Sequence, residues 1–279
     1  MKPAFAKPNS ALAGLISCYW GWEVSSKQAK EFGELPNVFP SVENEIHISY
    51  GDPIRIGLLS EQGEEWISSQ GHIVGNHLRP FRIQTTGNVG FFNVRLLPGA
   101  FYELFGVSAD EADSPVTDLE LIGNRLEYYD FIDRIRDAGS FTERAAVADQ
   151  YFSKLLNSKI QNSPLVNGAL VEITRSKGRI RISQLAKNLG VVKKTLERKF
   201  LERIGRNPKE FSRLVRFQNA AWMRLEKRNL SELSLDAGFY DQPHLTREFS
   251  SLSGYSPLTW YGKRDSILSL FYNTRPDSF

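Results

Sequence analysis

The stretch GFYDQPHLTREFSSLSGYSPLTW, residues Gly238–Trp260, has a near copy earlier in the chain, and this duplication decides the fold. The earlier copy lies in ISQLAKNLGVVKKTLERKFLERIGRNPKEF, residues Ile182–Phe211. Matching residues are 48 positions apart up to the first glycine of each copy and 49 positions apart after it. The matched pairs are Ile182/Leu230, Leu185/Leu233, Ala186/Ser234, Leu189/Ala237, Gly190/Gly238, Leu196/Leu245, Arg198/Arg247, Phe200/Phe249, Gly205/Gly254, Pro208/Pro257 and Phe211/Trp260.

Each copy predicts a helix, a turn and a second helix. Apolar residues spaced i, i+3, i+4, i+7 give the first helix one buried face, and Ser183 and Ser231 are the expected N-caps. The glycine that follows permits the left-handed backbone that ends a helix. The spacing therefore predicts helix-turn-helix motifs at about 183–201 and 231–250, joined by a linking helix at about 208–228.

The outer face of each second helix carries polar and basic side chains. Arg and Lys pair with guanine edges, Gln pairs with adenine, and Thr contacts the thymine methyl group. A polar helix face is also the ordinary solvated surface of a globular protein, but two matched copies favour DNA reading. The candidate base contacts are Lys193, Lys194, Glu197, Arg198, Gln242, His244, Thr246 and Arg247.

The predicted linking helix has an apolar side for packing against both motifs. It would hold the two second helices about one DNA turn, roughly 34 Å, apart. Its polar side carries the candidate phosphate contacts Arg213, Arg216 and Arg224.

The net charge of +3 over 279 residues conceals two opposite halves. Residues 1–166 carry 14 Lys+Arg and 21 Asp+Glu, a net charge of −7, whereas residues 167–279 carry 21 and 11, a net charge of +10. A basic half beside an acidic half indicates that the C-terminal part meets a polyanion. The single cysteine, Cys18, excludes an internal disulfide and fits a reducing cytoplasm. No apolar run reaches the ~18 residues of a membrane span.

The N-terminal half predicts a β-rich barrel or sandwich with a helical tail, so the fold class is α+β with a C-terminal all-α domain. Short alternating segments separated by glycines favour this architecture. Strands are expected within 44–58, where turn residues 51–53 indicate a hairpin, and at 66–73, 81–85 and 89–96. Helices are expected at 100–105, from 119 onward and at 141–156. The domains are expected at 1–156 and 165–264, with a linker at 157–164 and a tail at 265–279.

Residues 167–264 resemble the AraC/XylS family of bacterial transcription regulators. The resemblance is strongest in Gly238–Trp260, which follows the family's signature of Gly-Phe, Asp-Gln-x-His, Leu/Phe-x-Arg-x-Phe and Gly-x-x-Pro. It implies that the eight candidate base contacts form the family's DNA-reading surface.

Three positions of the motifs bear on this resemblance. Val192 stands where the family usually has Ser or Thr, and it cannot cap the first reading helix, which is expected to cost ~1 kcal/mol. Asp241 keeps a capping side chain in the second motif, and Pro243 is tolerated in a first helical turn. Ser234 replaces the family's usual alanine, a change that we expect to be mild.

The N-terminal half resembles the sensor-like domain of one branch of the same family. The matching stretches are LPNVFPSVENEIHISYGDPIRI and VGFFNVRLLPGAFYELFGVSADEADSPVTDLE. The resemblance implies a degenerate cupin-like barrel that binds a small effector or forms dimers.

Histidines, Cys18 and aromatic residues are the remaining candidates for a small-molecule site. His72 and His77 lack the close His-x-His pairing of metal-binding cupins, so neither a metal nor a cofactor is expected. We interpret Cys18 as a small buried apolar residue. Core packing is the default role for the aromatic residues, and an effector pocket is the alternative. The metal candidates are His47, His72 and His77, and the candidate pocket residues are Trp20, Trp22, Trp66 and Phe91.

The sequence thus predicts a DNA-binding transcription regulator that is not an enzyme. The alternative is a cupin-type small-molecule or metal-dependent enzyme with an accessory DNA-binding module. A third hypothesis limits the N-terminal domain to dimerisation. The expected partner is double-stranded DNA, together with RNA polymerase, a small effector and a second copy of the chain; no membrane partner is expected, and the expected location is the cytoplasm.

Overall fold

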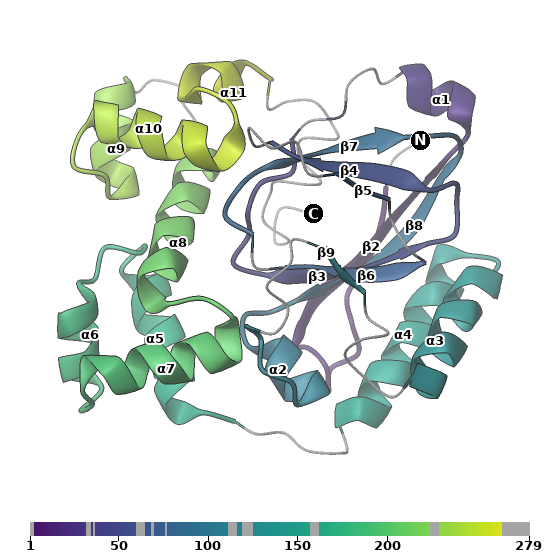
Figure 1. Cartoon of the computed structure of the whole chain (residues 1–279), viewed down its shortest axis with the longest axis horizontal. Helices are drawn as coiled ribbons and strands as arrows, with labels where there is room; N and C mark the ends of the chain where they lie inside the picture. Colours follow the sequence, from purple (N-terminus) through teal and green to yellow (C-terminus); the bar gives the residue numbers. More distant parts are fainter. Residues whose placement is uncertain are drawn as a thin grey trace.

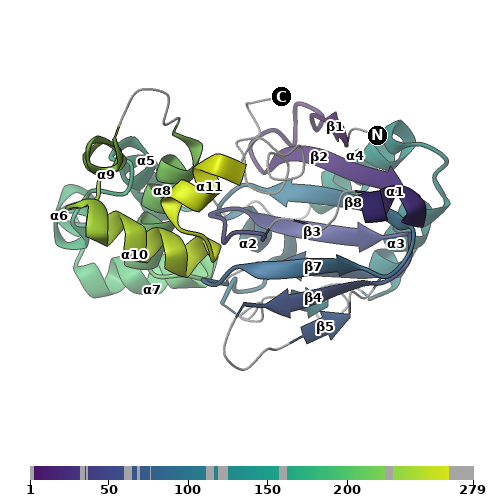
Figure 2. The same ribbon diagram turned by 90° about the horizontal axis from the view of Figure 1, so that it is seen from above.

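The computed structural model comprises an N-terminal β domain and a C-terminal helical domain, which confirms the expected α+β class (Figure 1). Seen from above, the helical domain lies beside one end of the β domain (Figure 2). The structure describes residues 3–31, 35, 37–59, 65–67, 70–75, 77–110, 116–118, 125–156, 162–223 and 229–263. None of the helices in these ranges is long and apolar enough to cross a lipid bilayer.

The β domain consists of two antiparallel sheets. The larger has the strand order β1-β2-β8-β3-β6-β9, and the smaller has the order β5-β4-β7. The strands are β1 (Ala4–Ala6), β2 (Ile16–Val24), β3 (Asn44–Ser49), β4 (Ile54–Leu58), β5 (Glu65–Ile67), β6 (Gly71–Val74), β7 (Phe81–Thr85), β8 (Val89–Leu96) and β9 (Val116–Asp118).

The larger sheet is buried on both faces, as its strand β8 shows, because every residue of that strand is buried. On the outer face Phe92 and Val94 pack with residues of three helices. On the inner face Phe91 packs with Trp20 and Trp22 of β2. The helices of this domain are α1 (Ser26–Glu31), α2 (Ala100–Phe105), α3 (Arg125–Asp137) and α4 (Phe141–Leu156).

Among the described residues of the C-terminal domain, all regular elements are helices, and they form two hydrophobic cores, one for each copy of the repeat. Its helices are α5 (Pro164–Arg175), α6 (Ile182–Asn188), α7 (Lys193–Ile204), α8 (Pro208–Trp222), α9 (Leu230–Ala237), α10 (Gln242–Ser253) and α11 (Pro257–Lys263). In Figure 1, α8 runs between the α6–α7 pair and the α9–α10 pair.

Several local predictions from the sequence are confirmed. Strands β7 and β8 and helices α2 and α4 have the expected bounds. The predicted hairpin is wrong, because β3 pairs with β6 and β8 whereas β4 pairs with β5 and β7 of the other sheet. The segment expected as one strand at 66–73 contributes to two strands, β5 and β6. The turn at 51–53 therefore connects β3 of the larger sheet to β4 of the smaller sheet and does not form a hairpin.

The helix caps also differ from the prediction. Helix α6 follows Arg181 and has no side-chain cap, and α9 follows Asn229, so neither Ser183 nor Ser231 is an N-cap. Asn229 and Glu232 form a capping box, which satisfies two backbone N–H groups at once. Helix α8 ends at Trp222, before the expected 228, and the candidate phosphate contact Arg224 lies outside the described residues.

Candidate nucleic-acid interface

The first motif consists of α6, a short turn and α7. Leu196, Phe200 and Ile204 lie four residues apart on α7 and are buried in the first core. Leu185 and Ala186 of α6 are buried in the same core. Gly205 ends α7 with a φ of 74°, a left-handed conformation that glycine adopts at little cost. The inner face of α7 is thus fixed against α6, and its outer face is directed away from the core.

The second motif repeats this arrangement with α9 and α10. Leu245, Phe249 and Leu252 of α10 pack with Leu233 and Ala237 of α9 in the second core. The buried Ser234 is accommodated because its hydroxyl donates to the carbonyl oxygen of Ser231, 2.7 Å away.

Helix α8 joins the motifs by contributing to both cores. Phe211 and Val215 pack in the first core, and Leu214 and Phe217 pack in the second. A capping box of Asn207 and Glu210 fixes the start of the helix. The prediction that this helix packs against both motifs is confirmed.

Helices α7 and α10, the second helices of the two motifs, present matching surfaces. From Lys193 to Phe200 the order of exposed, partly buried and buried residues is the same as from Gln242 to Phe249. All eight candidate base contacts are exposed or partly buried, so none is taken up by a core. Within α7, the Lys193 ammonium lies 3.3 Å from the Glu197 carboxylate.

The starts of α7 and α10 differ as expected. Asp241 caps α10, because its carboxylate accepts from the His244 amide at 2.7 Å. Val192 precedes α7 in an extended conformation without a side-chain cap. Pro243 lies in the first turn of α10, where its missing N–H removes no helix hydrogen bond. The first turn of α7 therefore lacks a hydrogen bond that α10 has.

Both described candidates for phosphate contact already bind groups within the protein. The Arg213 guanidinium lies 2.5 Å from the Glu248 carboxylate of α10. Arg216 is partly buried and donates to the carbonyl oxygen of Gly178.

The candidate effector residues lie in two places. Trp20, Trp22 and Phe91 pack together with Cys18 on the inner face of the larger sheet, where all four are buried. Trp66 packs in a separate cluster with residues of the smaller sheet. Burial raises the Cys18 pKa to about 11, which fits its interpretation as a buried apolar residue.

The three metal candidates are all buried histidines. The rings of His47 and His72 lie side by side with centroids 4.8 Å apart, whereas His77 donates from Nδ1 to the Arg79 carbonyl oxygen at 2.6 Å. Burial lowers the pKa of His72 to about 4. Burial and the neighbouring charge of protonated His72 lower the pKa of His47 well below its usual value. Among the described residues no group of three His, Cys, Asp or Glu side chains is placed to hold a metal ion.

A cleft of about 910 Å³ lies between the domains. Leu15, Leu97 and Pro98 of the β domain and Leu170 and Val171 of α5 line it. This volume and its largely apolar lining suit a small organic molecule.

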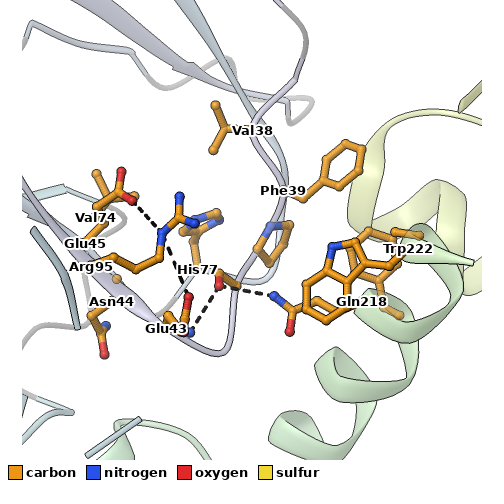
Figure 3. A pocket seen from close by; sticks show the side chains of 15 residues that line it. Val38, Phe39, Glu43, Asn44, Glu45, Val74, His77, Arg95, Gln218 and Trp222 are labelled. Atoms are coloured by element: carbon orange, nitrogen blue, oxygen red, sulfur yellow. Dashed lines mark hydrogen bonds and ion pairs between the residues drawn. The ribbon is translucent and has the colours of Figure 1, made fainter. Parts of the chain in front are cut away.

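The sequence did not indicate that a segment of the β domain, residues 37–43, packs against the helical domain. We call Asn37–Glu43 the strap; it leaves the β domain at Val38, which pairs with Phe81 of β7. The Phe39 ring enters the second core, with its centroid 4.7 Å from that of Trp260. Figure 3 shows the cavity beside the strap, with Arg95 next to Glu43 and Glu45.

Arg206 is the other residue that the sequence left unassigned. It lies in the turn between α7 and α8 and is 4% exposed. Its guanidinium donates to the carbonyl oxygens of Ser41 at 2.5 Å and of Gly75 and His77 at 3.3 Å. Burial lowers its pKa to about 10, so it stays charged at neutral pH. Only its place in the repeat, opposite Tyr255, marks it in the sequence.

Comparisons with known proteins agree with the two-domain arrangement. Residues 185–263 match the family described as Helix-turn-helix domain, and residues 5–117 match a domain of unknown function, DUF6597. A search of curated proteins finds no match.

Three solved structures illustrate the similarity. An AraC-type transcriptional regulator from Chromobacterium violaceum is 20% identical, with a TM-score of 0.34, over 37% of this chain and 94% of that chain. An apo variant of ToxT from Vibrio cholerae is 12% identical, with a TM-score of 0.48, over 88% of this chain and 97% of that chain. Wild-type ToxT from Vibrio cholerae with a bound unsaturated fatty acid is 13% identical, with a TM-score of 0.44, over 92% and 96%.

Proposed function

Residues 185–263 match the helix-turn-helix family, and we propose that the chain is an AraC-type DNA-binding transcription regulator rather than an enzyme, in which α7 and α10 read two neighbouring segments of the major groove in one specific DNA site. The observation that carries this proposal is the matched exposure of the two reading helices. An α-helix fits the major groove, where each base pair presents a distinct pattern of donors and acceptors. The +10 charge of residues 167–279 supports the approach to DNA.

The side chains divide by chemistry. Arg198 and Arg247 occupy equivalent, exposed positions and are suited to bidentate pairing with guanine. Gln242 is suited to adenine, and Thr246 is suited to the thymine methyl group. On this proposal Glu197 exchanges its ion pair with Lys193 for a cytosine amino group.

Phosphate contacts are proposed for the arginines of the linking segment. Arg213 and Arg216 use part of their guanidinium groups within the protein, and each guanidinium has five N–H donors. Such contacts would fix the register of the protein on the duplex without reading sequence.

A gel-shift experiment with the DNA upstream of the protein's own gene tests the proposal. We expect the full chain to give a shift that the unlabelled fragment abolishes and that a scrambled fragment of equal length leaves in place. Failure to shift any fragment in preference to its scrambled counterpart would refute specific DNA binding.

We further propose that a small effector binds in the cleft between the domains and modulates DNA binding. Support comes from the size and apolar lining of the cleft and from α5, which forms one wall and packs in the first core. Trp20, Trp22, Trp66 and Phe91 remain the other proposed location, and the burial of Trp20, Trp22 and Phe91 favours the cleft.

Thermal unfolding with a panel of metabolites tests the effector. A ligand at 100 times its Kd adds about 2.7 kcal/mol to the free energy of unfolding. The substitution Val171→Trp should abolish this shift, because Val171 is 52% exposed and lines the cleft. Leu235→Trp is the matched control, since Leu235 is 62% exposed on α9. A stable dimer that no ligand shifts would favour dimerisation alone.

A further inference from the structure

The strap contacts equivalent turns in the two copies of the repeat. Arg206 and Tyr255 occupy matching positions, each directly after the glycine that ends a reading helix. Arg206 donates to the Ser41 carbonyl oxygen, and the Tyr255 hydroxyl accepts from the Asn37 amide at 3.2 Å. One short segment of the β domain therefore holds the C-terminal ends of both reading helices.

The contacts at the second turn are close and directional. The Asn37 side-chain amide donates to the Ser253 carbonyl oxygen at 3.0 Å, at the end of α10. A Cβ on Gly254 would lie 2.7 Å from that amide nitrogen, so the strap touches the backbone of the turn itself. Phe39 inserts beside Tyr255 and Trp260, which places a β-domain side chain inside the second core.

At the first turn, the buried guanidinium of Arg206 relies on the β domain for its hydrogen-bond acceptors. All three oxygens that accept from Arg206 belong to residues before α2, and its Nε atom has no partner among the described residues. Loss of these carbonyl oxygens would leave the guanidinium buried without acceptors, which would strongly destabilise the folded protein. Val42 of the strap packs against both cores.

A second contact from the β domain supports the same arrangement. The Ala109 amide donates to the Glu202 carbonyl oxygen at 2.8 Å, and the Ser108 hydroxyl donates to the same oxygen at 3.1 Å. Glu202 lies in the last turn of α7, so α7 is held at its end and its base-reading first turns stay exposed.

We infer that the strap is a positioning element for DNA reading, which sets the orientation of α7 relative to α10 so that both enter the major groove together. Helix α8 links the motifs, and the strap bridges the turns that follow α7 and α10 on the side of the β domain. Asn37 and Arg206 are positioning residues because they act on the reading helices and do not themselves reach DNA. This inference rests on the proposed two-segment reading.

Loosening the strap should therefore lower DNA affinity only at sites that both motifs contact. If the strap loosens, each motif keeps its own core and reads its own segment, but the gain from simultaneous contact is lost. Binding to a site with both segments should weaken, whereas binding to a site with one segment scrambled should stay nearly constant. Discrimination against a site with one base pair inserted between the segments should also weaken.

The test uses the full chain and two pairs of matched variants, with affinities measured by fluorescence anisotropy. Arg206→Met removes a buried guanidinium from the strap contact, and its control Arg144→Met removes a buried guanidinium that donates to Ile135 within the β domain. Asn37→Ala has the control Asn9→Ala, which removes a bond to Ser153 within the β domain.

We expect Arg206→Met and Asn37→Ala to weaken two-segment binding by about 10-fold, as for a typical coupling between sites, and one-segment binding by less than about twofold. Hydrogen exchange should rise at both turns in these variants. The controls should leave the ratio of the two affinities unchanged. An unchanged ratio in both strap variants, or an equal change in the controls, would overturn the inference. Absence of specific binding by the unsubstituted protein would instead overturn the proposed function, and the inference with it.

Discussion

The first turn of α7 offers a direct test of how these helices are stabilised. Val192 precedes α7 with φ −73° and ψ 145°, nearly the conformation of Asn207 before α8, at −76° and 157°. The side chain of Asn207 accepts from the amide three residues later at 2.9 Å. The backbone at 192 is therefore already in the N-cap conformation, and only the acceptor is missing.

The substitution Val192→Asn should supply that acceptor. Asn is worth about 1 kcal/mol more than Ala at an N-cap, within a range of about 0.5–2 kcal/mol. Val192→Ala is the reference, because it removes the same two methyl groups without adding an acceptor. Val192 is 69% exposed, so neither substitution removes a side chain from a core. Asp241→Ala should show the reverse effect, with a loss of about 1–2 kcal/mol, because its 2.7 Å hydrogen bond is removed together with a negative charge at a helix N-terminus.

Thermal unfolding of the full chain measures these differences. About 1 kcal/mol corresponds to a Tm change of about 2–4 °C for a chain of this size class. Hydrogen exchange of the first α7 amides, which should slow in Val192→Asn, assigns the effect to that turn. Equal Tm values for Val192→Asn and Val192→Ala would refute the capping argument.

DNA contact and the buried histidines have consequences that can be measured. Arg247→Ala should relax base preference at one position by ~1–3 kcal/mol, measured with a set of single-base operator variants, and an unchanged preference would refute the orientation of α10. DNA affinity should fall with salt by a log–log slope of ~0.9 for each phosphate neutralised, so a flat titration would contradict phosphate contact. The lowered pKa values of His47 and His72 make the unfolded chain bind more protons below pH ~6.5. The free energy of unfolding should therefore fall between pH ~6.5 and the His72 pKa of about 4, and this loss should shrink in His72→Gln.

Local patterns in the sequence predicted most of the helices and strands. Helix α4 has its expected bounds because helical spacing is set by neighbouring residues. The repeat predicted the buried faces of α7 and α10, since Phe200 and Phe249 must be covered in any stable helix pair.

Pairings between distant residues could not be predicted in the same way. The turn at 51–53 indicated a reversal, but the choice between a hairpin and a change of sheet depends on strands that follow later in the chain. The N-cap positions are Arg181 and Asn229 and not the predicted serines. A Ser is also compatible with the first turn of a helix, so the helix can begin one or more residues before it. Phe39 and Arg206 resemble loop residues, and the hydrogen bond from Arg206 joins positions 165 residues apart.

Selection of binding sites from randomised duplex DNA tests whether α7 and α10 both read sequence. We expect a motif of two conserved blocks with centres about 10–10.5 base pairs apart, the spacing of two reading helices on one face of the duplex. We also expect that Arg198→Ala degrades one block and Arg247→Ala degrades the other. A single conserved block that both substitutions degrade equally would contradict reading by two helices.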